Sequence, residues 1–298
     1  MTRDDKQDQL VRVVSKDGAF RAAAVQTTGL VTAVCDRQQT DPTATVALGR
    51  LLSGGALLSS LLKEDQRLAL LIEGNGPLQR LSVEADARGR VRGKVAQPSA
   101  GLPPKAGRFD VAGAVGKAGF LHVWKDLGLK EPYQSMVQLQ TSEIAEDLAW
   151  YLSQSEQVPS SLGLGVELDS AGQVAAAGGF LVQALPGGDD DQIAALVAKL
   201  EQLPPTTTLL RQGLTPVHIL EKIFGQADFR IQQEQPLTFH CPCNRRQIAR
   251  MLHGLGREEL TALLQEQEQV EVTCEYCRQR YRFSHAEVEQ LIALPAKT

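Results

Sequence analysis

Apolar and polar residues alternate over several short stretches in the first part of the chain, with the two-residue period of strands that bury one face. Residues 11–14 and 20–25 follow this pattern on either side of a turn at residues 16–18, and they predict a β-hairpin. Three further stretches, separated by turns at residues 74–77 and 88–89, predict an antiparallel meander: residues 68–72, 81–85 and 91–95.

Between the hairpin and the meander, the apolar period changes to that of a helix. Asp41 supplies an N-cap and Pro42 occupies the first helical position, so an apolar helix is expected from Thr43 to about Leu62. Glycines weaken a helix, and inside an apolar one they indicate close packing against a sheet. Three glycines fall in this helix: Gly49, Gly54 and Gly55.

The chain is less regular between residues 98 and 185. Residues 98–119 are rich in glycine and proline and are expected to form a loop with one short strand. Thr141-Ser142-Glu143 is a capping sequence that opens a helix to about Ser153. Residues 166–185 predict a second hairpin, which turns at residues 169–172. The N-terminal part is therefore expected to fold as one α+β domain built on antiparallel sheet.

The clearest change in composition lies at residues 186–191, where Pro-Gly-Gly is followed by three aspartates. After it, apolar residues recur at helical spacing until two prolines at 204–205, and Thr215 with Pro216 opens a second short helix over residues 217–224. Short helices with one apolar face are stable only when they are docked on something larger. Residues 187–236 are therefore expected to be an amphipathic helical linker after an N-terminal domain of residues 1–186.

The last part, residues 237–298, predicts a small domain with a thin core. Asn244 can cap a first helix, and Ser284 begins a capping-box sequence for the last one. A unit of about 60 residues with so few apolar positions is expected to need a metal ion to fold. The predicted elements are helices over residues 245–253, 257–266 and 284–294 and strands over residues 270–273 and 281–283.

Four of the five cysteines lie in this last part as two close pairs, Cys241 with Cys243 and Cys274 with Cys277. Zinc prefers a tetrahedron of soft ligands, and two local pairs can supply all four thiolates. The spacing leaves open whether the site is structural or a switch, because the one-residue spacer brings the first two sulfurs close enough to bond to each other. The expected fold class is α+β, with a large antiparallel-sheet domain, a helical linker and a small C-terminal zinc-binding domain.

Residues beside the pairs allow two interpretations. Positive charge lowers a thiol pKa and favours the oxidisable thiolate, but a solvated charged face explains the same arginines equally well. These arginines are Arg245, Arg246, Arg278 and Arg280. His240 adjoins Cys241 and is expected to be a neighbour rather than a ligand, because four thiolates already complete a zinc site. The fifth cysteine, Cys35, lies in an apolar run and is expected to pack in the core.

Composition and charge narrow the range of possible functions. The formal charge is −4 and the pI is near 5.8, so there is no general basic field to attract nucleic acid. The charged N-terminus lacks the apolar core of a signal peptide, and no apolar run approaches the length of about 18 residues that spans a membrane. A cytoplasmic location without membrane association is expected. In a reducing cytosol, paired cysteines are more often metal-binding or redox-active than structural.

Two other classes of protein remain open from the residues. Cys274-x-x-Cys277 is also the spacing of thiol–disulfide oxidoreductases, but there it opens a helix, whereas a strand precedes it here. A zinc-ribbon nucleic-acid-binding protein is the second alternative. Seven arginines against six glutamates between Cys241 and Phe283 are too balanced for a surface that follows phosphates.

At this point the chain resembles a known family, the redox-regulated holdase chaperones of the bacterial heat-shock response, or thirty-three-kilodalton chaperonins. The resemblance covers essentially the whole chain. Two of its segments contain the cysteines, residues 238–243 and 270–277. The others lie far from them in sequence: residues 42–50, 131–135, 155–160 and 178–186.

The resemblance implies a mechanism. In the reduced state four thiolates hold one Zn²⁺ and the chaperone is inactive. Oxidation by peroxide or hypochlorite is expected to form the disulfides Cys241–Cys243 and Cys274–Cys277, to release zinc, to unfold the C-terminal domain and to undock the helices of residues 187–224. The exposed apolar surface then captures unfolding client proteins without ATP, and the family tends to form a homodimer when active. The resemblance thus implies a chaperone rather than an enzyme.

Overall fold

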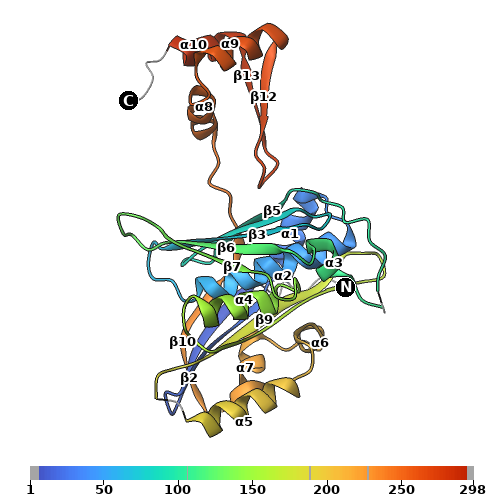
Figure 1. Ribbon diagram of the computed structural model, residues 1–298, viewed down its shortest axis with the longest axis vertical. Coiled ribbons are helices and arrows are strands. Elements are labelled where there is room, and N and C mark those ends of the chain that lie inside the picture. The colour runs from blue at the N-terminus through green and yellow to red at the C-terminus, as the bar shows by residue number, and fades with distance from the viewer. Residues whose placement is uncertain (1–6, 106, 188, 227, 294–298) are drawn as a thin grey trace. The chain divides into compact units, whose positions relative to one another are not determined.

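The computed structural model describes residues 7–105, 107–187, 189–226 and 228–293 (Figure 1). The charged N-terminus of residues 1–6 and the predicted end of the last helix at Leu294 lie outside the described residues. Contacts divide the chain into two compact units, one ending at His240 and the other beginning at Cys241. Mixed helices and antiparallel sheets confirm the predicted α+β class.

A five-stranded antiparallel sheet contains both predicted hairpins. Its strand order is β10-β1-β2-β9-β8, with every neighbouring pair antiparallel. The turns need backbone conformations that favour glycine, and they have Gly18 at φ 76° and Gly172 at φ 77°. The strands are β1 Gln9–Ser15, β2 Phe20–Gln26, β8 Ser160–Leu168, β9 Val174–Ala184 and β10 Phe229–Pro236.

A second sheet of six strands has the order β11-β5-β4-β3-β6-β7. The predicted meander is confirmed as β3 Arg67–Gly74, β4 Arg80–Asp86 and β5 Arg90–Val95. The sequence did not predict the other three strands, of which only β11 runs parallel to its neighbour. These are β6 Gly119–Asp126, β7 Tyr133–Gln138 and β11 Thr238–Phe239.

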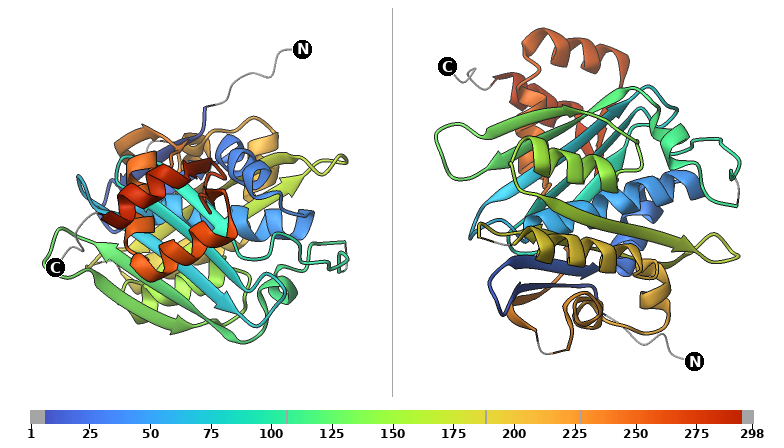
Figure 2. Two further views of the ribbon diagram at one scale, coloured as in Figure 1. Left: turned by 90° about the horizontal axis from the view of Figure 1, so that it is seen from above. Right: turned by 60° about the horizontal axis from the view of Figure 1, so that its bottom comes forward.

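Helix α2, Pro42–Ser59, lies between strands of the two sheets and is buried along almost its whole length (Figures 1 and 2). Its predicted cap is confirmed, since the Asp41 carboxylate accepts a hydrogen bond from Ala44 N at 2.8 Å. A Cβ on Gly54 would lie 2.4 Å from Leu148, and one on Gly55 would lie 2.7 Å from Val83. The glycines therefore allow the close packing that the sequence indicated.

Two predictions on the N-terminal part were wrong. Residues 98–119 contain a short helix, α3 Val111–Val115, where a short strand was expected, because the Asp110 carboxylate caps it by accepting from Gly113 N. Helix α4, Ala145–Gln154, begins after Ile144 and not at Thr141. The intervening loop wraps around Asp147, whose buried carboxylate accepts from four backbone N–H groups: Gln140 at 2.7 Å, Thr141 at 3.1 Å, Ser142 at 3.3 Å and Ile144 at 3.0 Å.

The two predicted helices of residues 187–236 are present, and a third helix, α6, was not predicted; all three pack on the five-stranded sheet. They are α5 Asp190–Glu201, α6 Thr206–Arg211 and α7 Pro216–Phe224. They cover the side of the sheet away from α2, because alternate strand residues enter the two cores: Ala22 and Ala24 face these helices, and Ala23 and Val25 face α2 (Figures 1 and 2). The segment also contributes the strand β10, so it is more than a helical linker. That residues 187–236 form a segment separate from the N-terminal domain of residues 1–186 stays a prediction.

The chain is fastened to the first unit up to the residue before Cys241. Leu237 N donates to Asp8 O at 2.9 Å, Thr238 N to Gly89 O at 2.9 Å, and His240 N to Val91 O at 3.1 Å. Arg37 lies 4.5 Å above the ring of Phe239. We refer to residues 237–240 as the anchor segment.

Asp8 joins this anchor segment to helix α1, Thr28–Gln38, which the sequence did not predict. The Asp8 carboxylate accepts from Gly29 N at 3.1 Å and from Leu30 N, and so caps a helix that lacks a local capping side chain. Burial raises the pKa of Asp8 from 3.8 to about 6, and it outweighs these hydrogen bonds, which lower that pKa.

The raised pKa of Asp8 gives the first unit a specific pH dependence. Since the folded state binds the proton more tightly, this contribution to stability is complete below pH 3.8 and is lost as the pH rises through about 6. From pH 4 to pH 7 it should lower the free energy of unfolding by about 2 kcal/mol, and Asp8→Asn should remove this change. Urea unfolding followed by tryptophan fluorescence measures it, because both tryptophans, Trp124 and Trp150, lie in this unit. If the free energy of unfolding of Asp8→Asn varied with pH in the same way as that of the parent, Asp8 would not be the source of this pH dependence.

Candidate metal centre

The second unit holds the four clustered cysteines on two segments, the stretch before its first helix and the turn between two strands. Its elements agree with the prediction: helices α8 Arg245–His253, α9 Arg257–Glu266 and α10 His285–Ala293, and strands β12 Gln269–Thr273 and β13 Arg280–Ser284. Both predicted caps are confirmed. Asn244 accepts from Gln247 N at 3.0 Å, and Ser284 and Glu287 accept from each other's backbone N–H groups at 3.4 and 2.9 Å.

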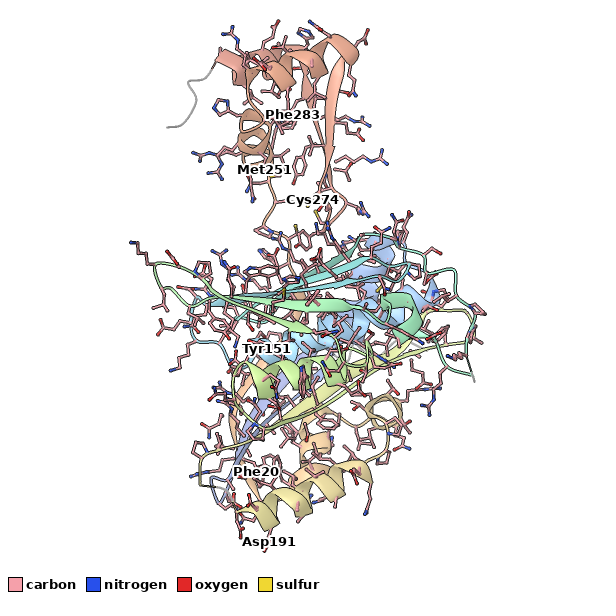
Figure 3. All side chains as sticks on the ribbon, in the orientation of Figure 1. Phe20, Tyr151, Asp191, Met251, Cys274 and Phe283 are labelled. Carbon is pink, nitrogen blue, oxygen red and sulfur yellow. The ribbon has the colours of Figure 1, made fainter. Side chains whose placement is uncertain are left out.

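Local structure positions each cysteine pair. Cys241 and Cys243 precede the Asn244 cap, which fixes the point where the extended chain becomes α8. Cys274 and Cys277 lie in the turn between β12 and β13, at the end of the hairpin in Figure 3 where Cys274 is labelled. This turn is closed by two hydrogen bonds of 2.9 Å, from Arg278 N to Cys274 O and from Cys274 N to Gln279 O.

The four sulfur atoms lie within 4.8 Å of one another. Cys241 Sγ is 3.8 Å from Cys274 Sγ, and Cys243 Sγ is 3.2 Å from Cys277 Sγ. A zinc ion with Zn–S bonds of about 2.3 Å needs sulfurs about 3.8 Å apart at the corners of a tetrahedron. The thiols thus fit a four-thiolate metal site, and His240 is not in the cluster found among the described residues.

The surroundings shift the pKa values of three of these thiols, two upward and one downward. Burial raises the pKa of Cys243 and of Cys277. Burial also opposes ionisation of Cys274, but hydrogen bonds from the backbone N–H groups of Cys277 and Tyr276 help to lower its pKa to about 7. These backbone hydrogen bonds favour the thiolate form of Cys274.

One neighbour of the site was not singled out from the sequence. Tyr281 Oη lies 3.2 Å from Cys243 Sγ, and this contact is the main cause of a raised Tyr281 pKa. Tyr281 was expected only as a strand residue, because a hydrogen bond across 38 residues leaves no pattern in the spacing.

At least two of the flanking arginines are engaged elsewhere. Arg245 pairs with Glu287 at 2.5 Å and lies 4.4 Å above the ring of Phe283, while Arg280 is 3.7 Å from Glu271. Their charges are thus compensated within the unit, as expected for a solvated charged face. Cys35 is buried in the core of the first unit, as predicted, and burial raises its pKa to about 11.

Known proteins resemble this chain over nearly its whole length. The sequence model of the family described as Hsp33 protein matches residues 8–284. The 33 kDa chaperonin of Syntrophotalea carbinolica is 56% identical, over 96% of this chain and 99% of the relative. That of Geobacter sulfurreducens is 51% identical, over 95% and 94% of the two chains.

The structure supports the same relationship. The crystal structure of the Thermotoga maritima 33 kDa chaperonin superimposes with a TM-score of 0.90 at 38% identity, covering 96% of this chain and 98% of that one. Among the described residues, no helix is both long and apolar enough to cross a membrane. The chain belongs to the Hsp33 family, whose members are chaperones and not enzymes.

Proposed function

We propose that this protein is a redox-regulated, ATP-independent holdase that captures unfolding proteins under oxidative stress in the cytoplasm. The observation that supports it best is the cluster of four thiols within 4.8 Å in a chaperone of this family. In the reduced, inactive state one Zn²⁺ is held by Cys241, Cys243, Cys274 and Cys277 as thiolates. The ion supplies the cross-link between the two cysteine pairs.

Oxidation removes these ligands in pairs. Two thiolates, one hydrogen peroxide and two protons yield one disulfide and two water molecules, and the proposed pairs are Cys241–Cys243 and Cys274–Cys277. Sulfurs bonded to each other no longer act as anionic ligands, so the protein releases the ion.

The second unit depends on the metal for its fold. Among its described residues the buried apolar core consists of six: Ile248, Leu252, Leu260, Val270, Phe283 and Val288. A structural zinc site contributes about 10–16 kcal/mol of apparent folding free energy in small domains, comparable with or larger than the whole stability of a typical domain. Loss of the four thiolate ligands should therefore unfold the unit.

Helix α5 is the part of the first unit best suited to undock. None of its residues is buried, and a pocket of about 240 Å³ lies beneath it, lined in part by Phe20, Val182, Ile193 and Leu196. Undocking of α5 to α7 would expose the apolar face that β1, β2 and β9 present to them. We propose that this face binds clients and that the active form is a homodimer.

A charge placed under α5 tests this proposal. Leu196→Asp should weaken docking by roughly 2 kcal/mol, about thirtyfold, because it removes apolar contact and buries a carboxylate. The reduced, zinc-loaded variant should bind more apolar dye than the parent and partly suppress aggregation of a heat-denatured enzyme. Ala195→Asp, on the exposed side of the same helix, is the matched control. If the two variants bound the same amount of dye and suppressed aggregation equally, α5 would not be the helix that covers the client-binding face.

One experiment separates the proposed function from the two alternatives. The protein is treated with peroxide and excess zinc chelator while zinc release, helix content and suppression of client aggregation are followed together. As zinc is released, the helix content should fall and the suppression of client aggregation should rise on the same time course. An oxidised, zinc-free protein that stays folded and holds no client would refute the holdase. Insulin-reductase turnover would favour an oxidoreductase, and salt-sensitive nucleic-acid binding would favour a zinc ribbon.

A further inference from the structure

The hydroxyl of Tyr281 gives Cys243 a hydrogen-bond partner that comes from the other half of the site. Cys243 belongs to the first cysteine pair, whereas Tyr281 lies on β13, four residues after Cys277. Oη and Sγ are 3.2 Å apart, within the distance of a hydrogen bond to sulfur. Since a thiolate can only accept, the phenol is the donor when Cys243 is ionised as a metal ligand.

The tyrosine is held in place by its strand. Tyr281 pairs with Val272 of β12 and packs against the buried core of the second unit, on the same face of β13 as Phe283. Because residues two apart on a strand share a face, this packing directs the ring and leaves the hydroxyl at the cysteine cluster. The contact is thus set by the fold of the unit and not by a flexible side chain.

Such a hydrogen bond changes the chemistry of the sulfur. Oxidation begins when a thiolate lone pair attacks peroxide: an S–O bond forms, the O–O bond breaks, and hydroxide leaves to be protonated to water. The neighbouring thiolate then attacks the sulfenic sulfur, forming the disulfide and releasing a second hydroxide. A donor on the Cys243 sulfur withdraws electron density from the attacking lone pair, and it also orients and stabilises the ligand.

We propose that Tyr281 is a positioning residue that protects Cys243, and hence the Cys241–Cys243 pair, from premature oxidation and so sets the oxidant concentration at which the protein responds. This inference rests on the proposed redox function of the site. It assigns to the phenol a role in addition to the packing of its ring.

Tyr281→Phe separates these two roles, because it keeps the ring and removes the donor. Loss of an outer hydrogen bond to a metal ligand typically costs ten- to a hundredfold in affinity, so zinc should bind about tenfold more weakly. Peroxide should oxidise the first cysteine pair several-fold faster. Trypsin cleavage after arginine places the two pairs on separate peptides, residues 231–245 and 258–278, so mass spectrometry reads each pair independently.

The controls address a merely structural effect. Tyr276→Phe removes the other tyrosine hydroxyl of this unit and should leave the first pair at the parental rate. Tyr281→His restores a donor and should regain part of the protection, even if Tyr281→Phe folds less well. In cobalt-loaded protein, the thiolate-to-cobalt absorption band should shift in Tyr281→Phe and not in Tyr276→Phe.

The outcomes distinguish this inference from the proposed function. If Tyr281→Phe oxidises its first pair at the parental rate with an unchanged cobalt band, Tyr281 has no protective role, whatever the oxidised protein does to clients. If the oxidised parental protein fails to hold clients, the holdase function is wrong, while the cobalt band and peptide rates still decide the role of Tyr281.

Discussion

Cys243→Ser is expected to lower the zinc affinity by two to three orders of magnitude. One of four thiolates contributes about a quarter of the roughly 10–16 kcal/mol of a structural zinc site, which is about 3–4 kcal/mol. A serine hydroxyl stays protonated near neutral pH and replaces little of this. The second unit should then be partly unfolded at low free zinc, and the protein should hold clients to some extent without oxidant. Competition with a chromophoric chelator measures the affinity.

Cys35→Ser is the matched control, because Cys35 lies in the core of the other unit. The Cys35→Ser variant should bind zinc with the affinity of the parent, and the substitution should lower only the free energy of unfolding of the first unit. Far-ultraviolet circular dichroism should show loss of the helices α8 to α10 in Cys243→Ser, while tryptophan fluorescence should show that the first unit around Trp124 and Trp150 keeps its fold. An unaltered zinc affinity in Cys243→Ser would disprove the four-cysteine site.

Asp147→Ala is expected to destabilise the first unit by roughly 2–6 kcal/mol. The substitution leaves four backbone N–H groups without their carboxylate acceptor. Those of Ser142 and Ile144 are buried and cost about 1–3 kcal/mol each, whereas Gln140 and Thr141 are exposed to water. These bonds also hold two residues at positive φ, Ser142 at 62° and Ile144 at 76°, a conformation that is especially unfavourable for a β-branched side chain.

Urea unfolding monitored by Trp150, three residues after Asp147, measures this loss. Glu146→Ala is the control at the neighbouring, exposed position, where the change should stay below about 1 kcal/mol. Similar destabilisation by both substitutions would show that helix propensity, and not the carboxylate, matters at this helix start.

The second unit was predictable nearly element by element because its signals are local. Asn244 and Ser284 cap helices that begin at the next residue, and the spacing of the cysteines indicates the site directly. Helix α1 was missed for the opposite reason, since Asp8, its cap, lies about 20 residues upstream. Strand β10 contains mostly polar residues and depends on pairing with β1. Its sequence alone carries no strand signal.

Strand β6, which lies between β3 and β7 in the six-stranded sheet, shows the same limit. On β6, Phe120, His122 and Trp124 occupy the outward positions, so apolar and aromatic residues stand on both faces and the alternation is obscured. The contact of Tyr281 with Cys243 depends on how two distant segments meet. Sequence reasoning therefore found the cysteine cluster that spacing defines and missed the residue that only the folded unit brings to it.

The anchor segment also bears on how the proposed redox switch would reset. Because His240 is still bonded to Val91, an unfolded second unit would remain a tail held at one end of the folded first unit. A chain of about 60 residues has an unfolded radius of gyration of about 23 Å, so its two cysteine pairs stay at millimolar concentration relative to each other. The meeting of the two reduced cysteine pairs is thus an intramolecular step, whose rate does not fall when the protein is dilute.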